Sequence, residues 1–183
     1  MLRPEPKGND EGKEIWSQGR KSGGAPCMIV FCAFEQMMYV IEKGREYGFK
    51  NYIAMQFYKN YSPQVLKANM RVVGNTEYAI LLYRNRLPKF NNGGRMVFNN
   101  IPYPRDTETI KIHPTQKSVP LLQYLIELFT DKGDVVIDPC AGSGSTLLAA
   151  ARCGRKAYGF EIKKDFYKDA TEKVLRMIQY NLF

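Results

Sequence analysis

The sequence has little of what metal centres, disulfide frameworks and membrane spans require. Its four cysteines form no CxxC pair, and its single histidine cannot complete a Cys/His zinc site. Cys27 and Cys153 lie in apolar segments and are expected to be buried, reduced thiols. No apolar run is long enough to span a bilayer, and residues 1–14 lack the apolar core of a signal peptide. These absences predict a soluble, intracellular protein without a metal site or a membrane segment.

The composition is that of one globular domain with a strong basic excess. The chain has 183 residues, of which 44% are hydrophobic and 25% charged, as is typical of a folded domain. Lys and Arg number 27 against 18 acidic residues, which gives a net charge of +9. A basic excess favours a polyanion as partner, because each neutralised phosphate releases counterions. The alternative from charge alone is a basic protein that is merely soluble.

The order of the expected elements indicates an α/β fold. Residues 1–26 are a polar leader with a short helix around 11–18, and residues 27–183 form the domain. The pattern predicts strands at 27–34, 51–58, 77–83, 134–138 and 156–161, and helices at 35–47, 63–73, 118–130, 145–153 and 164–180. The run 27–34 is apolar throughout, which predicts a strand buried on both faces, and 77–83 is expected antiparallel to 51–58. Short alternating steps of strand and helix are typical of a doubly wound sheet.

The most informative stretch is DVVIDPCAGSGST at 134–146. An apolar strand ends at Asp138, a tight glycine turn follows, and a helix begins near Ser145. The glycines let a ligand approach the backbone at the sheet edge where α/β folds bind ligands. Glu161 ends the next strand and can accept hydrogen bonds from both hydroxyls of a ribose. A glycine turn followed by a strand-end acid predicts an adenosine-type ligand, and glycines that serve only packing are the alternative. The dinucleotide motif GxGxxG and the phosphate-loop motif GK[ST] are absent.

Two motifs resemble those of a known family. DPCAGSGST at 138–146 is similar to the DPFAGSGTT-type cofactor motif of DNA N6-adenine and N4-cytosine methyltransferases. HPTQKS at 113–118 resembles the HPTQKP motif that precedes it in the family's beta arrangement, although Ser118 replaces the second proline. The resemblance is strong over 113–183 and weaker over 23–84. It implies a Rossmann-like methyltransferase sheet, S-adenosylmethionine as cofactor and DNA as substrate, as in restriction–modification enzymes.

The resemblance also implies which residues hold the cofactor. Thr115, Gln116 and Lys117 are expected near its methionine end, and Glu161 at its ribose. His113 is expected to be a loop anchor, since no nucleophile or metal cluster surrounds it. The residues expected to line the cofactor from the turn are Asp138, Ala141, Gly142, Ser143, Gly144 and Thr146.

Residues 84–112 are the candidate for DNA contact. They are polar, contain NNGG and IPYP, and predict a long irregular surface segment. Four basic residues lie within them, and a solvated basic loop is the alternative. These residues are Arg84, Arg86, Lys89 and Arg95.

The family's catalytic loop is not recognisable. That loop, (D/N/S)PP(Y/F), accepts the hydrogens of the target amine and stacks a ring on the extruded base. It precedes the 27–34 strand in the beta arrangement, and residues 1–26 contain no such motif. Asn100-Ile101-Pro102-Tyr103 matches three of the four letters and is a weak candidate for a displaced loop. A rigid turn with an exposed tyrosine is the alternative.

The sheet is therefore expected to be incomplete, because the strand that carries the catalytic loop lies centrally in the family, between 134–138 and 27–34. A truncated product, a partner chain that supplies the strand and a contribution from the leader are all open. Three functions are open as well: a DNA methyltransferase in truncated or split form, a non-catalytic cofactor- or DNA-binding module that complements or regulates a partner, and an unrelated nucleotide-binding or small-molecule methyltransferase domain. The HPTQK stretch argues against the third.

Overall fold

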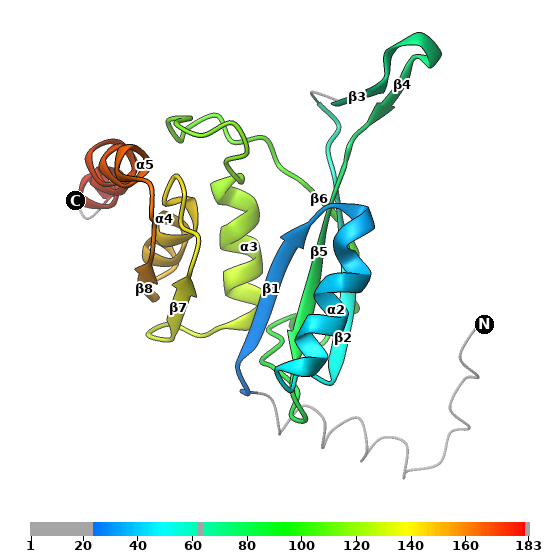
Figure 1. The fold of residues 1–183 in the computed structure, drawn as a ribbon. Helices are drawn as coiled ribbons and strands as arrows, with labels where there is room; N and C mark the ends of the chain where they lie inside the picture. Colours follow the sequence, from blue (N-terminus) through cyan, green and yellow to red (C-terminus); the bar gives the residue numbers. More distant parts are fainter. Residues whose placement is uncertain (1–23, 62–63, 182–183) are drawn as a thin grey trace, which may run out of the picture.

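A computed structural model describes residues 24–61 and 64–181 (Figure 1). The short helix expected around 11–18 lies outside these residues. The strands are β1 (Cys27–Cys32), β2 (Asn51–Tyr58), β3 (Gln64–Lys67), β4 (Val72–Gly74), β5 (Thr76–Tyr83), β6 (Asn100–Pro102), β7 (Val135–Asp138) and β8 (Lys156–Gly159). The α-helices are α2 (Met37–Glu46), α3 (Val119–Phe129), α4 (Ser145–Arg152) and α5 (Lys164–Asp169).

Four strands form one half of the sheet, in the order β1-β5-β2-β6. β5 runs antiparallel to both β1 and β2. The expected antiparallel pairing of 77–83 with 51–58 is therefore confirmed. Helix α2 covers one face, where Ile41 packs against Ile80 and Leu82. Gly48, with a φ of 86°, follows the helix end, in the left-handed conformation that glycine adopts without strain.

The prediction of a helix at 63–73 is wrong. Strands β3 and β4 form a hairpin there, with Val65 paired to Val73, and a short 3-10 turn at Ala68–Met70 lies between them. β-Branched side chains favour strands, because a helix restricts their χ1 angles. Figure 1 shows this hairpin extending away from the rest of the molecule.

The segment 84–112 is less irregular than expected, because it contains β6. This strand pairs in parallel with β2 and sets Ile101 beside Phe57. Ile101 is 6% and Tyr103 is 5% exposed, so both side chains belong to the core and not to a surface turn. The two residues follow the period of a strand, but the short run and its flanking prolines conceal that pattern in the sequence.

The other half of the sheet consists of β7 and β8. They run parallel, with Asp138 beside Gly159. Helix α4 connects them and packs Leu148 against the same cluster as Val136 and Ala157. The strand–helix–strand order predicted for 134–161 is confirmed, with boundaries shifted by only one or two residues.

The last expected helix, 164–180, is α-helical only in its first part. It begins as α5, becomes a π-helical turn at Ala170–Val174 and ends as a 3-10 segment at Leu175–Asn181. The hydroxyl of Thr171 donates to the carbonyl of Tyr167 at 2.8 Å, and such a bond to the preceding turn distorts helices. None of the helices within 24–61 and 64–181 has both the length and the apolar character needed to cross a bilayer.

Helix α3 holds the two halves of the sheet together. The side chain of Ser118 accepts the N–H of Leu121 and caps the helix. Leu121 and Leu125 pack into the cluster beneath β2 and β5, whereas Leu122 and Ile126 pack into the cluster around α4. Burying one such side chain contributes about 1.5–3 kcal/mol, so these two faces of one helix are a strong link.

The two halves do not pair with each other in the part of the chain that the structure describes. There, β1 pairs only with β5, β7 pairs only with β8, and no ladder joins β1 to β7. Val135, Ile137 and Tyr158 are 52%, 63% and 58% exposed although they are apolar. Both faces of β1 are covered in part, because Ile29 and Phe31 pack against one core cluster and Val30 and Cys32 against the cluster beneath α2, whereas Met28 is 40% exposed. The expected α/β fold is confirmed, and within residues 24–61 and 64–181 its sheet is incomplete, as expected.

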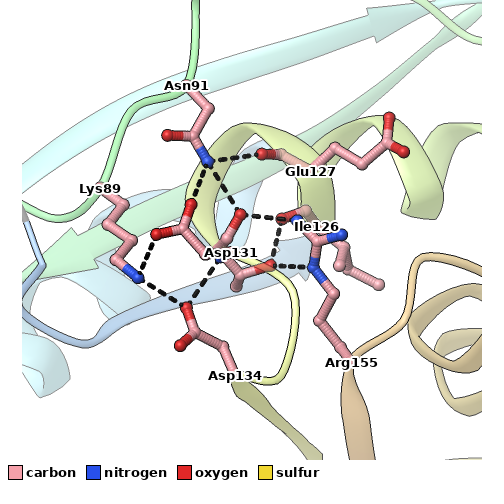
Figure 2. A network of polar contacts seen from close by, with 8 residues as sticks. Lys89, Asn91, Ile126, Glu127, Asp131, Asp134 and Arg155 are labelled. Atoms are coloured by element: carbon pink, nitrogen blue, oxygen red, sulfur yellow. Dashed lines mark hydrogen bonds and ion pairs between the residues drawn. The ribbon is translucent and has the colours of Figure 1, made fainter.

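A polar network fixes the loop after β5 to the turn between α3 and β7 (Figure 2). The Lys89 ammonium lies 2.6 Å from Asp131 and 3.0 Å from Asp134. The side-chain amide of Asn91 donates to the carbonyl of Thr130 at 2.8 Å. Asp134 directly precedes β7, so this network lies at the amino end of that strand, opposite to the glycine turn.

Candidate cofactor-binding site

The glycine turn predicted after Asp138 is confirmed at the carboxyl end of β7. Gly142 and Gly144 have φ values of 52° and 76°, a region in which other side chains are strained. The N–H of Gly144 donates to the carbonyl of Ala141 at 2.8 Å, and Gly144 is the N-cap of α4. The N–H of Gly142 donates to Glu161, so both glycine N–H groups are used within the protein, and Gly144 is buried against Ala170 and Leu175.

The pairing of β7 with β8 brings Glu161 to this turn. Its Oε1 accepts the N–H of Lys163 at 2.8 Å, and its Oε2 accepts the N–H of Gly142 at 2.9 Å. The hydrogen bond from the Lys163 N–H is the main reason that the pKa of Glu161 lies below its usual range, and the one from the Gly142 N–H lowers it further. A carboxylate has about four acceptor positions, so each oxygen can accept a further hydrogen bond.

A pocket of about 450 Å³ lies beside the turn. This is within the range of roughly 300–1,000 Å³ that small-molecule sites occupy. Phe160 and Ile162 are 65% and 94% exposed, and such open apolar side chains beside an acid suit a flat heterocycle. The pocket is lined by Pro139, Cys140, Gly159, Phe160, Glu161, Ile162 and Tyr167.

The sequence pattern indicated Glu161 but not the apolar residues around it. The signal that could have found them is the pair of large apolar residues on either side of a strand-end acid. The sequence pattern did not indicate Gly159 either, where an added Cβ would lie 2.6 Å from Leu147 Cδ1 and 3.0 Å from Ala141 Cβ. Only glycine allows β8 to approach the turn this closely, and this approach positions Glu161.

The first residues of the HPTQK motif are anchored to the C-terminal helix. The His113 ring packs edge-on against Phe166 of α5, with 4.5 Å between centroids. Its Nδ1 accepts the backbone N–H of Thr115 at 3.2 Å and lies 3.0 Å from the Thr115 hydroxyl. His113 is thus a loop anchor, as expected.

The side chain of Gln116 is used within the motif's own loop. Its Oε1 accepts the N–H of Ile112 and its Nε2 donates to the carbonyl of Ile110, both at 3.1 Å. Neither Thr115 nor Gln116 lines the pocket beside Glu161. The structure therefore orders this segment without bringing these side chains to that pocket.

Lys117 belongs to a three-residue ionic cluster. Its ammonium lies 2.7 Å from Glu77 at the start of β5, and Lys59 pairs with the other carboxylate oxygen. Burial raises the pKa of Glu77, but the hydrogen bonds from Lys117 and Lys59 outweigh it and leave the pKa lowered. Lys117 also lies 5.1 Å from the ring centroid of Phe31 in β1. The motif's lysine is therefore held over the end of β1.

The displaced-loop candidate Asn100–Tyr103 has no free aromatic face. Asn100 and Pro102 are exposed in β6, but Tyr103 lies in the core and its hydroxyl accepts the N–H of Ser118 at 3.0 Å. Burial is the main reason that the pKa of Tyr103 is raised. A ring in this position cannot stack on a base, and the alternative of an exposed tyrosine is also wrong.

Two of the four basic residues of the segment 84–112 make contacts within the protein. Lys89 pairs with two aspartates, as described above, and the Arg84 guanidinium lies 5.4 Å from the Phe49 ring centroid. Arg86 and Arg95 are exposed. Of the four basic residues expected to contact DNA, Arg86 and Arg95 are the better placed.

The four cysteines are free thiols with different surroundings. Cys153 is buried as expected, whereas Cys27 is only partly buried. Burial raises the pKa of Cys27 to about 11. Cys140 is exposed and lines the pocket, so it is the thiol best placed to react with a reagent in solution.

The fold and the site define a class of protein: an α/β sheet with a glycine turn and a facing acid, which together suit an adenosine-type ligand. A family model described as DNA methylase matches residues 14–172, and the chain belongs to that family. The resemblance to amino-group DNA methyltransferases is thereby confirmed.

Curated relatives and a solved structure agree with this assignment. Type II methyltransferase M2.LlaDCHI of Lactococcus lactis subsp. cremoris is 32% identical over 98 residues, which are 52% of this chain and 36% of that protein. DNA adenine methyltransferase YhdJ of Escherichia coli is 34% identical over 96 residues, which are 51% of this chain and 33% of that protein. The matches thus span about a third of these relatives.

The crystal structure of M1.HpyAVI, solved as a complex with S-adenosylmethionine, has the same fold. It matches with a TM-score of 0.70 at 24% identity, over 90% of this chain and 84% of that one.

Proposed function

We propose that this chain is the S-adenosylmethionine-binding part of a site-specific DNA methyltransferase that modifies the N6 amine of adenine or the N4 amine of cytosine. The observation that carries the proposal is the contact between Glu161 and the glycine turn, beside a pocket of about 450 Å³. Membership in the DNA methylase family supports it, as does the S-adenosylmethionine complex of M1.HpyAVI.

The residues of the pocket fit this cofactor. The Glu161 carboxylate accepts the two ribose hydroxyls, while Phe160 and Ile162 flank the adenine ring. Gly142, where an added Cβ would meet only the Cys140 carbonyl at 3.9 Å, allows the cofactor to lie against the backbone of the turn. When bound, the cofactor supplies an electrophilic methyl group. Around the turn the cofactor contacts Asp138, Ala141, Ser143 and Thr146. Its methionine end lies near Thr115, Gln116 and Lys117.

The methyl transfer itself requires a further segment. Within the residues that the structure describes, β1 and β7 each have an unpaired edge, and these edges support a strand inserted between the two half-sheets. A partner chain or another part of the same protein supplies this strand together with groups that accept the amine hydrogens. The burial of Tyr103 favours this division, and it also favours the second candidate function, a non-catalytic module that complements a partner.

Alkylation of Cys140 tests cofactor binding directly. A maleimide at neutral pH should label Cys140 first, because it is exposed, whereas burial raises the pKa of Cys27 and Cys153. Saturating S-adenosylmethionine should slow labelling of Cys140 at least about tenfold without changing the rates at the other thiols. Methionine alone and ATP are the matched controls. Equal labelling rates with and without S-adenosylmethionine, in a folded chain, would refute the proposal.

A further inference from the structure

The β3–β4 hairpin concentrates exposed apolar side chains within a short segment. In Figure 1 the hairpin extends past one end of the two half-sheets, and the turn between β7 and α4 lies at that same end. Val65, Leu66 and Met70 are 62%, 61% and 69% exposed, and Val72 and Val73 are 42% and 51% exposed. A two-stranded hairpin is marginally stable in water unless another surface covers it. Such a concentration of exposed apolar side chains marks a surface that contacts a partner.

The charge of the hairpin has one sign. Residues 64–76 contain Lys67 and Arg71 and no acidic residue, and both basic side chains are exposed. The chain as a whole carries a net charge of +9. A basic arm with an apolar surface complements DNA, whose phosphates flank grooves that contain the apolar methyl groups of thymine.

The conformation of Arg71 supports a role for its side chain. Within the described residues it is the one non-glycine residue with a positive φ, at 55°. This left-handed conformation suits glycine or asparagine, and residues held in it cluster at functional sites. The turn thus bears a guanidinium at a position where a smaller residue would be less strained.

We propose that the β3–β4 hairpin is a DNA-binding arm that enters the major groove. The groove is about 12 Å wide and admits a two-stranded ribbon. Lys67 and Arg71 contact phosphates, and Leu66 and Met70 pack against base edges. This inference rests on the proposed function, because DNA is the substrate there, and it adds a contact surface distinct from the loop at 84–112.

Salt-dependent DNA binding tests the arm. The variant Lys67→Gln/Arg71→Asn removes both charges and also relieves the positive φ at 71. The slope of log affinity against log salt, measured by anisotropy with a labelled duplex, should decrease by about 2, since each phosphate contact contributes about 0.9. The control Lys132→Gln/Lys156→Gln removes two exposed lysines at the amino ends of β7 and β8 and should leave the slope unchanged.

Two results would overturn the inference. One is an unchanged slope in Lys67→Gln/Arg71→Asn when Arg86→Gln/Arg95→Gln does lower it, which assigns DNA contact to the loop alone. The other is a change of sedimentation mass in Leu66→Ser/Met70→Ser with DNA affinity intact, which makes the hairpin a protein interface. Labelling of Cys140 with and without S-adenosylmethionine, measured on the same samples, reports separately whether the proposed function holds.

Discussion

The carboxylate of Glu161 accepts the backbone N–H of Gly142 at 2.9 Å, across 19 positions of the chain. The contact exists because β7 and β8 are parallel and in register, which sets Asp138 beside Gly159. The residues that follow the two strands therefore meet at one edge of the half-sheet. The acid and the glycine turn form one structural unit before any ligand is bound.

Replacing Glu161 with Ala should weaken S-adenosylmethionine binding by roughly 1–3 kcal/mol, because hydrogen bonds to a charged acceptor are lost. Titration calorimetry on both proteins measures the difference. Glu172→Ala removes another exposed carboxylate from the C-terminal region and should leave the affinity unchanged. Equal affinities for wild type and Glu161→Ala, with the fold intact, would remove Glu161 from the site.

The pH dependence of binding should follow the lowered pKa of Glu161. The carboxylate stays ionised to below the usual pKa of about 4.3, so the affinity should be constant from pH 8 to about 5. Its hydrogen bonds stabilise the fold above the unfolded-state pKa, and this contribution is lost as the pH falls through the folded-state pKa. Binding should weaken over that same acidic window, and calorimetry across pH measures it.

The variant Glu161→Gln separates this titration from general acid unfolding. It should bind weakly at every pH and show no acidic loss of its own. Glu77 and Asp106 also have lowered pKa values and titrate in a similar range, so circular dichroism must accompany each measurement. An affinity that falls already between pH 7 and 6 in wild type would contradict the assignment.

Gly159→Ala should destabilise the fold by about 1–3 kcal/mol, the usual effect of overpacking. The added methyl would lie 2.6 Å from Leu147 Cδ1, and β8 must move away from the turn to accommodate it. Urea unfolding measures the loss. Leu147→Ala removes the contacting atoms, so the double variant should lose less stability than the two single variants together. Strictly additive losses would show that this contact does not constrain position 159.

The sequence predicted most of the fold because apolar periodicity decides the elements that build the core. The bounds of β2 match the prediction, and α3 and α4 lie within one residue of theirs. The hairpin at 64–74 was missed because Val65 and Leu66 are exposed and show no alternation of buried and solvated positions. β6 was missed because Ile101 and Tyr103 are too few to define a period.

The site was predictable at positions where the local backbone or the ligand chemistry allows few residue types. A glycine with positive φ and a strand-end acid are both visible in the sequence, and Gly142 and Glu161 were identified in this way. The ion pair of Lys117 with Glu77 was not, because 40 positions separate the two residues and only the tertiary fold brings them together. The pocket residues Phe160 and Ile162 resemble core residues in the sequence, since hydrophobicity alone does not show which side chains remain exposed.

The last prediction is that this chain alone does not methylate DNA. An exocyclic amine is a poor nucleophile, because its lone pair is delocalised into the ring and its hydrogens must be accepted as the new bond forms. No Pro-Pro pair occurs in the sequence, so a (D/N/S)PP(Y/F) loop is absent from it. Without an aromatic platform, the cost of about a few kcal/mol for extruding a base is not offset.

A tritiated-methyl transfer assay on unmethylated genomic DNA decides the matter. Wild type and Tyr103→Phe should both be inactive, and adding a polypeptide that carries the catalytic loop and its strand should restore transfer. Activity of the wild type alone would refute the prediction. If Tyr103→Phe, which retains the ring but loses the buried hydroxyl, abolished such activity, the Asn100–Tyr103 segment would be implicated. If activity survived in Tyr103→Phe and in Tyr103→Ala, the groups that accept the amine hydrogens would lie elsewhere in the chain.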